Sequence, residues 1–474
     1  MDQLDALAIG VAVGVVGVYG VRWLWRRTRP RKVVAELREF FKTNPYDLPI
    51  VNRSFATVDL PNLHLAITQH TERLAAKTRV IGYSSPFGEH DNSLRSLMRG
   101  QVIFERITVG PVSYREVDVD VDRQMQCVEN AIHLIASAEQ RVAAHVRRDV
   151  LRGGLDLEVM AGSPELAANF IEQVRSIASQ SNVYRRKIIS LECDSEGWGA
   201  RGWVNVRFHR FAPVRREEIV LPAETIDVIE RNTVRFFQYA RLLRSSNRSL
   251  KRGLLFHGKP GTGKTYTARW LAQSLDGVTV ILLSGEQLWL IKQCCQMARM
   301  LAPSLVIMED VDLIATQRDE RRHPMYQITL HQLLNEMDGL ASDAEVILLL
   351  TTNRPDMLEP ALAARPGRID QAIEFPLPDA DSRRRLLELY GRGLYMDLKE
   401  PQSIIARTHG ASPAFIQELV RKASLIAAEA GSLRDGTLQV SDSHLDLALR
   451  ELVLGGGDLT RSLLGFAAQP LESH

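Results

Sequence analysis

The chain of 474 residues is 45% hydrophobic and carries a formal net charge of +2. On the rule of about 150 residues per domain, this length predicts about three domains with buried cores. Acidic and basic residues nearly balance, so the chain lacks the excess positive charge that is typical of nucleic-acid-binding proteins. No nucleic-acid partner is therefore expected. The four cysteines form no CxxC pair and no framework spacing, which indicates a reducing compartment.

The chain begins with an apolar stretch that is uncharged from residue 6 to residue 21. Residues 23–25 extend it past Arg22, and with Arg22 snorkelling it reaches the ~17 to 20 residues of a bilayer-spanning helix. Acidic residues precede the stretch and basic residues follow it up to Lys32. The positive-inside rule then predicts a single-pass membrane protein with its N-terminus outside and the rest cytoplasmic. An amphipathic or buried helix is the alternative, which the even apolar circumference disfavours.

The region after residue 32 has the pattern of a mixed α+β domain. Ser163 followed by Pro164 predicts a helix that runs to about Ser179, because serine caps a helix and proline suits its first turn. The other elements predicted from periodicity are a helix over 33–41, strands over 101–110 and 112–121, a long helix over 124–151, a strand over 155–160, and strands over 187–193 and 203–211. We see no chemical motif in this region, whose polar residues are expected to be core or surface groups.

A phosphate-binding loop follows an apolar strand over 254–257. Residues 258–265 read GKPGTGKT, and a helical run over 266–275 comes next. Strand, glycine-rich loop and helix are the context that such a loop requires, with Lys264 reaching the phosphate oxygens and Thr265 binding magnesium. We therefore predict ATP and Mg²⁺ as cofactors. The predicted nucleotide-binding residues are Gly258, Lys259, Pro260, Gly261, Thr262, Gly263, Lys264, Thr265 and Tyr266.

A second apolar strand ends in carboxylates, in the sequence LVIMEDVD at 305–312. In phosphoryl-transfer enzymes such acids serve the metal and the attacking water. The two acids resemble the acid pair of AAA proteins in the reverse of its usual order, and this resemblance implies that Glu309 holds Mg²⁺ through water, beside the ligand Thr265, and that Asp310 polarises the hydrolytic water. Because aspartate is shorter than glutamate, slow turnover is compatible with this assignment. A solvated acidic loop is the alternative, which the preceding strand disfavours.

A third buried strand over 346–350 leads to Asn353, whose amide can bind the γ-phosphate and the attacking water. The sequence ARPGRID follows and contains Arg365 and Arg368. Guanidinium groups beyond a strand edge suit an arginine finger that reaches the nucleotide of a neighbouring subunit. We therefore add these three residues to the predicted catalytic set. Ordinary surface arginines are the alternative for the last two.

Together these motifs resemble the AAA ATPase domain, over residues 250–425. The resemblance also includes LLNEMDG at 333–339, TTNRPDMLEPAL at 351–362 and RPGRIDQAIEFPLPD at 365–379. It implies an α/β P-loop fold with a parallel sheet flanked by helices, a small C-terminal helical lid, and a homo-oligomeric ring of six or seven subunits. Ala363 and Ala364 make the finger loop one residue longer than in most AAA proteins, which leaves the register of the two arginines open.

Within this superfamily, three features resemble the mitochondrial inner-membrane AAA chaperone that translocates the Rieske iron-sulfur protein. The acids occur in the order Glu309 then Asp310, and Pro413 stands in SPAFIQ where most AAA proteins have glycine. Only 18 residues separate Ser284 from Pro303, too few for the usual pore loop that grips extended polypeptide. The membrane-bound AAA proteases match less well, because the chain contains no HExxH motif.

The expected organisation is a transmembrane anchor with a basic flank over 1–32, an α+β middle domain of unknown role over 33–218, the large AAA subdomain over 219–380, the helical lid over 381–455 and a flexible tail over 456–474. The expected function is a membrane-anchored, chaperone-like ATPase that remodels or translocates an unknown protein substrate. The alternative is a nucleotide-gated membrane scaffold with little hydrolysis. A nucleic-acid motor is disfavoured by the charge balance, and salt-dependent DNA binding would revive it.

Overall fold

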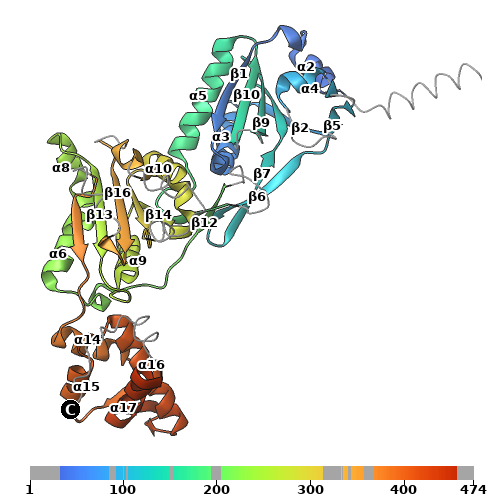
Figure 1. The fold of residues 1–474 in the computed structure, drawn as a ribbon. Coiled ribbons are helices and arrows are strands. Elements are labelled where there is room, and N and C mark those ends of the chain that lie inside the picture. The colour runs from blue at the N-terminus through green and yellow to red at the C-terminus, as the bar shows by residue number, and fades with distance from the viewer. Residues whose placement is uncertain are drawn as a thin grey trace, which may run out of the picture. The chain divides into compact units, whose positions relative to one another are not determined.

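A computed structural model describes residues 32–84, 92–99, 101–102, 105–149, 154–193, 204–312, 332–333, 335–339, 343–356 and 368–455. The chain divides into two compact units (Figure 1). The first comprises Met1–Val183 and Cys193–Asn205, and the second comprises Tyr184–Glu192 and Val206–His474. The polypeptide therefore passes between the units three times.

The membrane topology expected from the N-terminal sequence requires correction. Across the described part of the chain, no helix combines the length and the apolarity that crossing a membrane demands. A single-pass membrane protein with a cytoplasmic ATPase domain is therefore not supported. That expectation came from the apolar stretch and its flanking charges, and the 16 uncharged residues before Arg22 are few against the ~20 of a typical span. The stretch itself, like the predicted tail over 456–474, lies outside the described residues.

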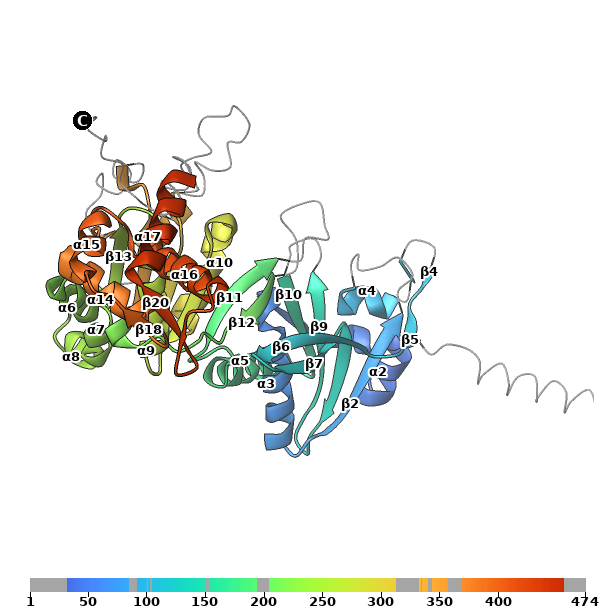
Figure 2. The same cartoon turned by 90° about the horizontal axis from the view of Figure 1, so that it is seen from below.

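The first unit is a six-stranded sheet with helices on both faces (Figure 2). Its strand order is β1 (Ile50–Phe55), β10 (Gly154–Ala161), β9 (Arg141–Asp149), β8 (Ala131–Ala136), β2 (Lys77–Ser84) and β5 (Thr108–Gly110). One face packs on α3 (Leu60–Arg73) and α5 (Pro164–Gln180), and the other on α2 (Val33–Phe41) and α4 (Leu94–Arg99). Neighbouring side chains of β10 enter different cores, Val159 the first and Met160 the second, as the alternation of a strand requires.

The long helix predicted over 124–151 is wrong. That segment forms β7 (Arg123–Glu129), β8 and β9, and β7 pairs with β6 (Ser113–Asp120) as a separate two-stranded ribbon. Strands covered on both faces are apolar almost continuously, so periodicity does not distinguish them from a buried helix. The predicted helix start is confirmed: α5 begins at Pro164, and the Ser163 hydroxyl accepts a hydrogen bond from the Leu166 amide.

The second unit is built on a seven-stranded sheet (Figure 1). Its order is β12 (Val204–Phe208), β11 (Ile188–Cys193), β14 (Thr279–Leu283), β15 (Ser304–Met308), β16 (Val346–Thr352), β13 (Lys251–His257) and β17 (Gln371–Glu374). From β11 to β17 the pairing is parallel. We expected β11 and β12 to close the middle domain, but β11 pairs with β14 and both strands extend this sheet.

Helices cover the sheet of the second unit, and a helical subdomain follows it. Before β13 come α6 (Ala223–Asn232), α7 (Val234–Gln238) and α8 (Ala240–Ser245), and later come α9 (Lys264–Ser274) and α10 (Ile291–Met300). The sheet shares one apolar core with α6, α7, α8 and α9, while α10 packs against β14 and β15. After β17, a separate core joins α14 (Ala380–Tyr390), α15 (Pro401–Arg407), α16 (Pro413–Glu429) and α17 (Asp442–Arg450). Strands β18 (Tyr395–Asp397), β19 (Leu433–Arg434) and β20 (Thr437–Ser441) complete this subdomain.

A network of buried polar groups spans neighbouring strands of the first unit. The Arg147 guanidinium forms ion pairs with Asp156 and Glu158, the second at 3.3 Å. Asp156 also accepts a hydrogen bond from the Ser54 hydroxyl at 2.7 Å. Glu158 accepts one from the Leu94 amide at 2.6 Å. Both carboxylates are almost fully buried, and Arg147 pairs with both, while Glu158 also contacts the His145 ring at 3.2 Å.

Replacing Arg147 by methionine should therefore destabilise the first unit by about 3 to 5 kcal/mol, because it leaves the buried Asp156 carboxylate without its cation. Hydrogen exchange of the slowest amides in β9 and β10 measures this free energy. The matched control is Arg175→Met, which removes an exposed pair with Glu172 and should cost less than about 1 kcal/mol. Equal effects of the two substitutions would contradict the structural role of Arg147.

Candidate nucleotide-binding site

The phosphate loop connects β13 to α9 at the carboxyl edge of the parallel sheet. Gly258 and Gly261 have φ values of +148° and +74°, which glycine adopts without the steric cost of a side chain. A Cβ on Gly258 would lie 2.4 Å from the Phe375 carbonyl oxygen. A Cβ on Gly261 would lie 2.9 Å from both the Ala414 Cβ and the Ser412 hydroxyl. The loop is thus held between the sheet and the lid, with the free N–H groups of α9 available to an anion.

Lys264 lies at the first position of α9 and is 6% exposed. Its ammonium donates hydrogen bonds to the carbonyl oxygens of Gly258 at 2.8 Å and Lys259 at 3.0 Å, and to the Asn353 Oδ1 at 2.8 Å. Burial lowers the pKa of Lys264 to about 8, against the opposing charges of Asp310 and Asp312. The loop thus folds around a desolvated cation, which an incoming phosphate would stabilise.

The two predicted catalytic acids follow β15 and serve different neighbours. The Glu309 carboxylate hydrogen-bonds the Thr265 side chain. Burial raises the pKa of Glu309, while the positive charge of Arg269 acts in the opposite direction. Asp310 has a φ of +52°, unusual for a residue with a side chain, and its amide donates to the Thr351 hydroxyl at 3.1 Å. The structure therefore brings Glu309 to Thr265 and leaves Asp310 facing Asn353.

Asn353 follows β16 and joins the cation to the acid. Its Oδ1 accepts from Lys264, and its Nδ2 donates to the Asp310 Oδ1 at 3.3 Å. The buried carboxylate of Asp312 accepts a hydrogen bond from the backbone N–H of Asn353 at 3.2 Å and another from the Thr352 hydroxyl at 3.0 Å. The sequence motif contained Asp312, but nothing in it distinguished an acid that positions the asparagine from one that faces the ligand.

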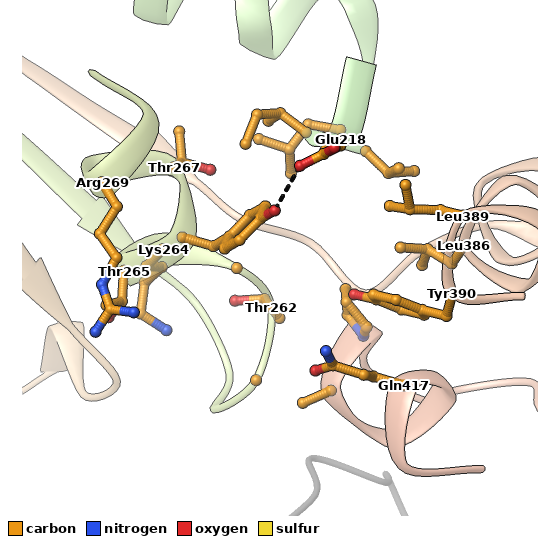
Figure 3. Close-up of a pocket in the computed structure, with 18 of the residues that line it drawn as sticks. Glu218, Thr262, Lys264, Thr265, Thr267, Arg269, Leu386, Leu389, Tyr390 and Gln417 are labelled. Atoms are coloured by element: carbon orange, nitrogen blue, oxygen red, sulfur yellow. Dashed lines mark hydrogen bonds between the residues drawn. The ribbon is translucent and has the colours of Figure 1, made fainter. Parts of the chain in front are cut away.

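A cavity of about 630 Å³ opens beside the phosphate loop, between the sheet and the lid (Figure 3). One wall comes from the lid, through Leu386, Leu389 and Tyr390 of α14 and Gln417 of α16. The Tyr266 hydroxyl donates to the Glu218 Oε2 at 2.8 Å across another side of the cavity. Sequence reasoning missed Glu218 and the lid residues, because they lie far along the chain from the motif. The other lining residues include Ile219, Val220, Leu221, Asp310, Asn353 and the loop from Pro260 to Thr265.

The structure describes only one of the two predicted arginine fingers. Arg365 lies outside the described residues. Arg368 donates from Nε to the Asp338 Oδ1 at 3.0 Å and from Nη2 to the Oδ2 at 2.7 Å. Its side chain is only 4% exposed. In this chain Arg368 therefore holds Asp338 against the segment that precedes β17, and it does not line the nucleotide cavity.

A parallel sheet with a phosphate loop, two acids and an asparagine at its carboxyl edge defines a P-loop ATPase domain. Residues 254–377 match the family described as ATPase family associated with various cellular activities (AAA). The second unit therefore contains an AAA ATPase domain. The match and the relatives described below indicate ATP hydrolysis by this domain.

Three curated relatives are each 34% identical to this chain over the matched region. The 26S proteasome regulatory subunit 8 homolog of Schizosaccharomyces pombe aligns over 44% of this chain and 53% of its own length. The ATP-dependent zinc metalloprotease FtsH 2 of Symbiobacterium thermophilum aligns over 44% and 36%, and the proteasome-activating nucleotidase of Methanothermobacter thermautotrophicus over 37% and 46%. The chain thus spans about half of these proteins or less. The finer resemblance to the Rieske-protein chaperone stays a prediction.

Substituting Gly261 by alanine should weaken ATP-analogue binding by at least about tenfold, because its Cβ would push the loop and the lid apart. Titration with a fluorescent nucleotide measures this affinity. Gly277→Ala is a matched control, since Gly277 has the same φ of +74° but nothing within 4 Å of an added Cβ. Equal affinities for the two variants would show that the contact between loop and lid is not required for binding.

Proposed function

We propose that this protein is an ATPase that works as one subunit of a homo-oligomeric ring of six or seven copies and remodels a protein substrate. The observation that carries the proposal is the chain of contacts from Lys264 through Asn353 to Asp310 beside a cavity of nucleotide size. The names of the relatives describe proteasome subunits, a protease and a nucleotidase. Those names support ATP-driven work on proteins.

Magnesium is the proposed metal partner of the nucleotide. Among the residues that the structure describes, no three His, Cys, Asp or Glu side chains cluster as a metal site. Mg²⁺ at phosphate sites uses one or two protein ligands together with phosphate oxygens. The hydrogen-bonded Thr265 hydroxyl and Glu309 carboxylate are hard oxygen donors of the kind that Mg²⁺ prefers. When bound there, the ion would neutralise charge on the phosphates.

The side chains around the phosphate end have separable roles in the proposed reaction. Lys264 exchanges its amide and carbonyl contacts for phosphate oxygens, which compensate its buried charge. Asp310 accepts a hydrogen bond from the attacking water and orients it for in-line attack. Asn353, released from Lys264, can then bind the water or the γ-phosphate. Asp312 fixes the backbone of Asn353, so the asparagine keeps its place when its partners change.

We favour an action on folded protein, as in the Rieske-protein chaperone, over threading of an extended chain. The segment between β14 and α10 contains a 3-10 helix of 6 residues, Gly285–Leu290. Its Leu288 and Leu290 side chains are buried. They hold the exposed Trp289 between them at the surface of the domain. This compact connection leaves little length for the mobile loop that threading requires.

ATP turnover by the full chain should rise steeply with protein concentration, because the site needs a neighbouring subunit. Asp310→Asn should lower turnover by about 100-fold or more while nucleotide binding persists, since general-base contributions have this size. Phosphate release and fluorescent-nucleotide titration measure the two quantities. Tight binding without turnover at any concentration would instead favour a nucleotide-gated scaffold. Turnover that is independent of concentration would contradict the ring.

The two arginines of ARPGRID should respond differently to alanine substitution. Arg365→Ala should lower turnover about 1,000-fold with unchanged thermal stability, as expected for an arginine finger. Arg368→Ala should also lower the free energy of unfolding by about 2 kcal/mol, because it breaks a two-pronged charged pair. Turnover assays and calorimetry separate the effects. Normal turnover in Arg365→Ala would rule out its role as a finger.

A further inference from the structure

The segment over residues 209–218, here named the α9 strap, runs from the end of β12 along the helix that follows the phosphate loop. The Gln273 side chain of α9 binds the strap twice. Its Oε1 accepts from the Val214 amide, and its Nε2 donates to the Ala212 carbonyl, both at 3.1 Å. Phe211 and Val214 also pack against the core of the sheet. These contacts fix the middle of the strap to the C-terminal half of α9.

One end of the strap meets a charged side chain near the catalytic acids. The Arg269 guanidinium lies 5.7 Å from the centre of the Phe211 ring. Arg269 and Glu309 line a second cavity, of about 350 Å³, and His209 and Phe211 of the strap line it too. Arg269 also lines the nucleotide cavity, and Figure 3 shows its side chain beside Thr265 and Lys264. It is therefore placed between the strap and the phosphate end of the site.

The other end of the strap reaches the nucleotide cavity at a second point. Glu218 accepts the hydrogen bond of Tyr266, which lies in the first turn of α9. The Arg392 guanidinium of the lid lies 3.8 Å from the same carboxylate. The strap thus lines the nucleotide cavity directly through Glu218 and, through Phe211, lies against Arg269, another residue of that lining. It also continues directly from β12, the strand by which the chain returns from residues 193–205 of the first unit.

We propose that Arg269 is a positioning residue for Glu309 and that its contact with Phe211 transmits nucleotide occupancy to the α9 strap. This inference rests on the proposed ATPase function. A cation over an aromatic ring is held more weakly than one paired with a carboxylate or a phosphate. Bound nucleotide adds phosphate charge near Glu309. The Arg269 guanidinium can then move from the Phe211 ring toward the Glu309 carboxylate or a phosphate. The Phe211 ring then loses its contact with the cation, so the packing of the strap depends on whether nucleotide is bound.

Hydrogen exchange of the full chain tests this coupling, with Mg²⁺ and a non-hydrolysable ATP analogue as the probe. The analogue should change the exchange rate of the strap amides, Val214 included, by about fivefold or more in the wild-type protein. Arg269→Met and Phe211→Leu should abolish that change and leave the protection of the phosphate loop intact. Arg244→Met is the matched control, because Arg244 pairs with Glu345 and lines neither cavity.

Kinetics supply the second readout. Arg269→Met should lower kcat about tenfold and leave the analogue affinity within about threefold, and the double variant with Phe211→Leu should be no slower than Arg269→Met alone, as expected for residues that act together. A strap that still responds in Arg269→Met, or losses that multiply in the double variant, would overturn the inference. Absent protection of the wild-type phosphate loop would instead overturn the proposed function and, with it, the inference.

Discussion

The active edge of the second unit depends on one desolvated ammonium group. Lys264 reaches back to two carbonyls of its own loop and across to Asn353, so loop, helix and the strand β16 share a single cation. Its burial requires neighbours that supply negative charge or dipoles. The acids after β15 and the carbonyls of the loop supply them before any ligand arrives. The arrangement is therefore preorganised for an anion, and phosphate replaces contacts that already exist.

Strands β11 and β12 extend the sheet of the second unit and connect it to the first unit. A parallel sheet presents its chemistry at the carboxyl ends of its strands, and β11 joins that edge beside β14. The chain crosses between the units three times in this region. The first unit is therefore joined to this sheet by three covalent connections, where a domain attached through one terminal linker has a single one.

Much of the site could be predicted from short sequence windows, because a phosphate loop and an acid-tipped strand are local patterns. The lid side of the cavity could not be predicted, since α14 and α16 bring Leu386 and Gln417 to it from more than a hundred residues away. The helix predicted over 124–151 failed for a related reason. Whether an apolar run becomes a strand or a helix depends on the layers that cover it, and these are set by distant segments. Likewise, the inward turn of Arg368 depends on Asp338, which no spacing rule supplies.

The lid carries a last consequence in the way α16 begins. Pro413 has no backbone N–H, so Ala414 supplies the first amide of that helix, and this amide donates to the Gly261 carbonyl of the phosphate loop at 3.2 Å. This hydrogen bond joins the first turn of α16 to the phosphate loop. An outward movement of the lid would break this hydrogen bond and expose the phosphate loop at the same time. Release of a nucleotide from the loop would then depend on the contact with the lid as well as on the pocket.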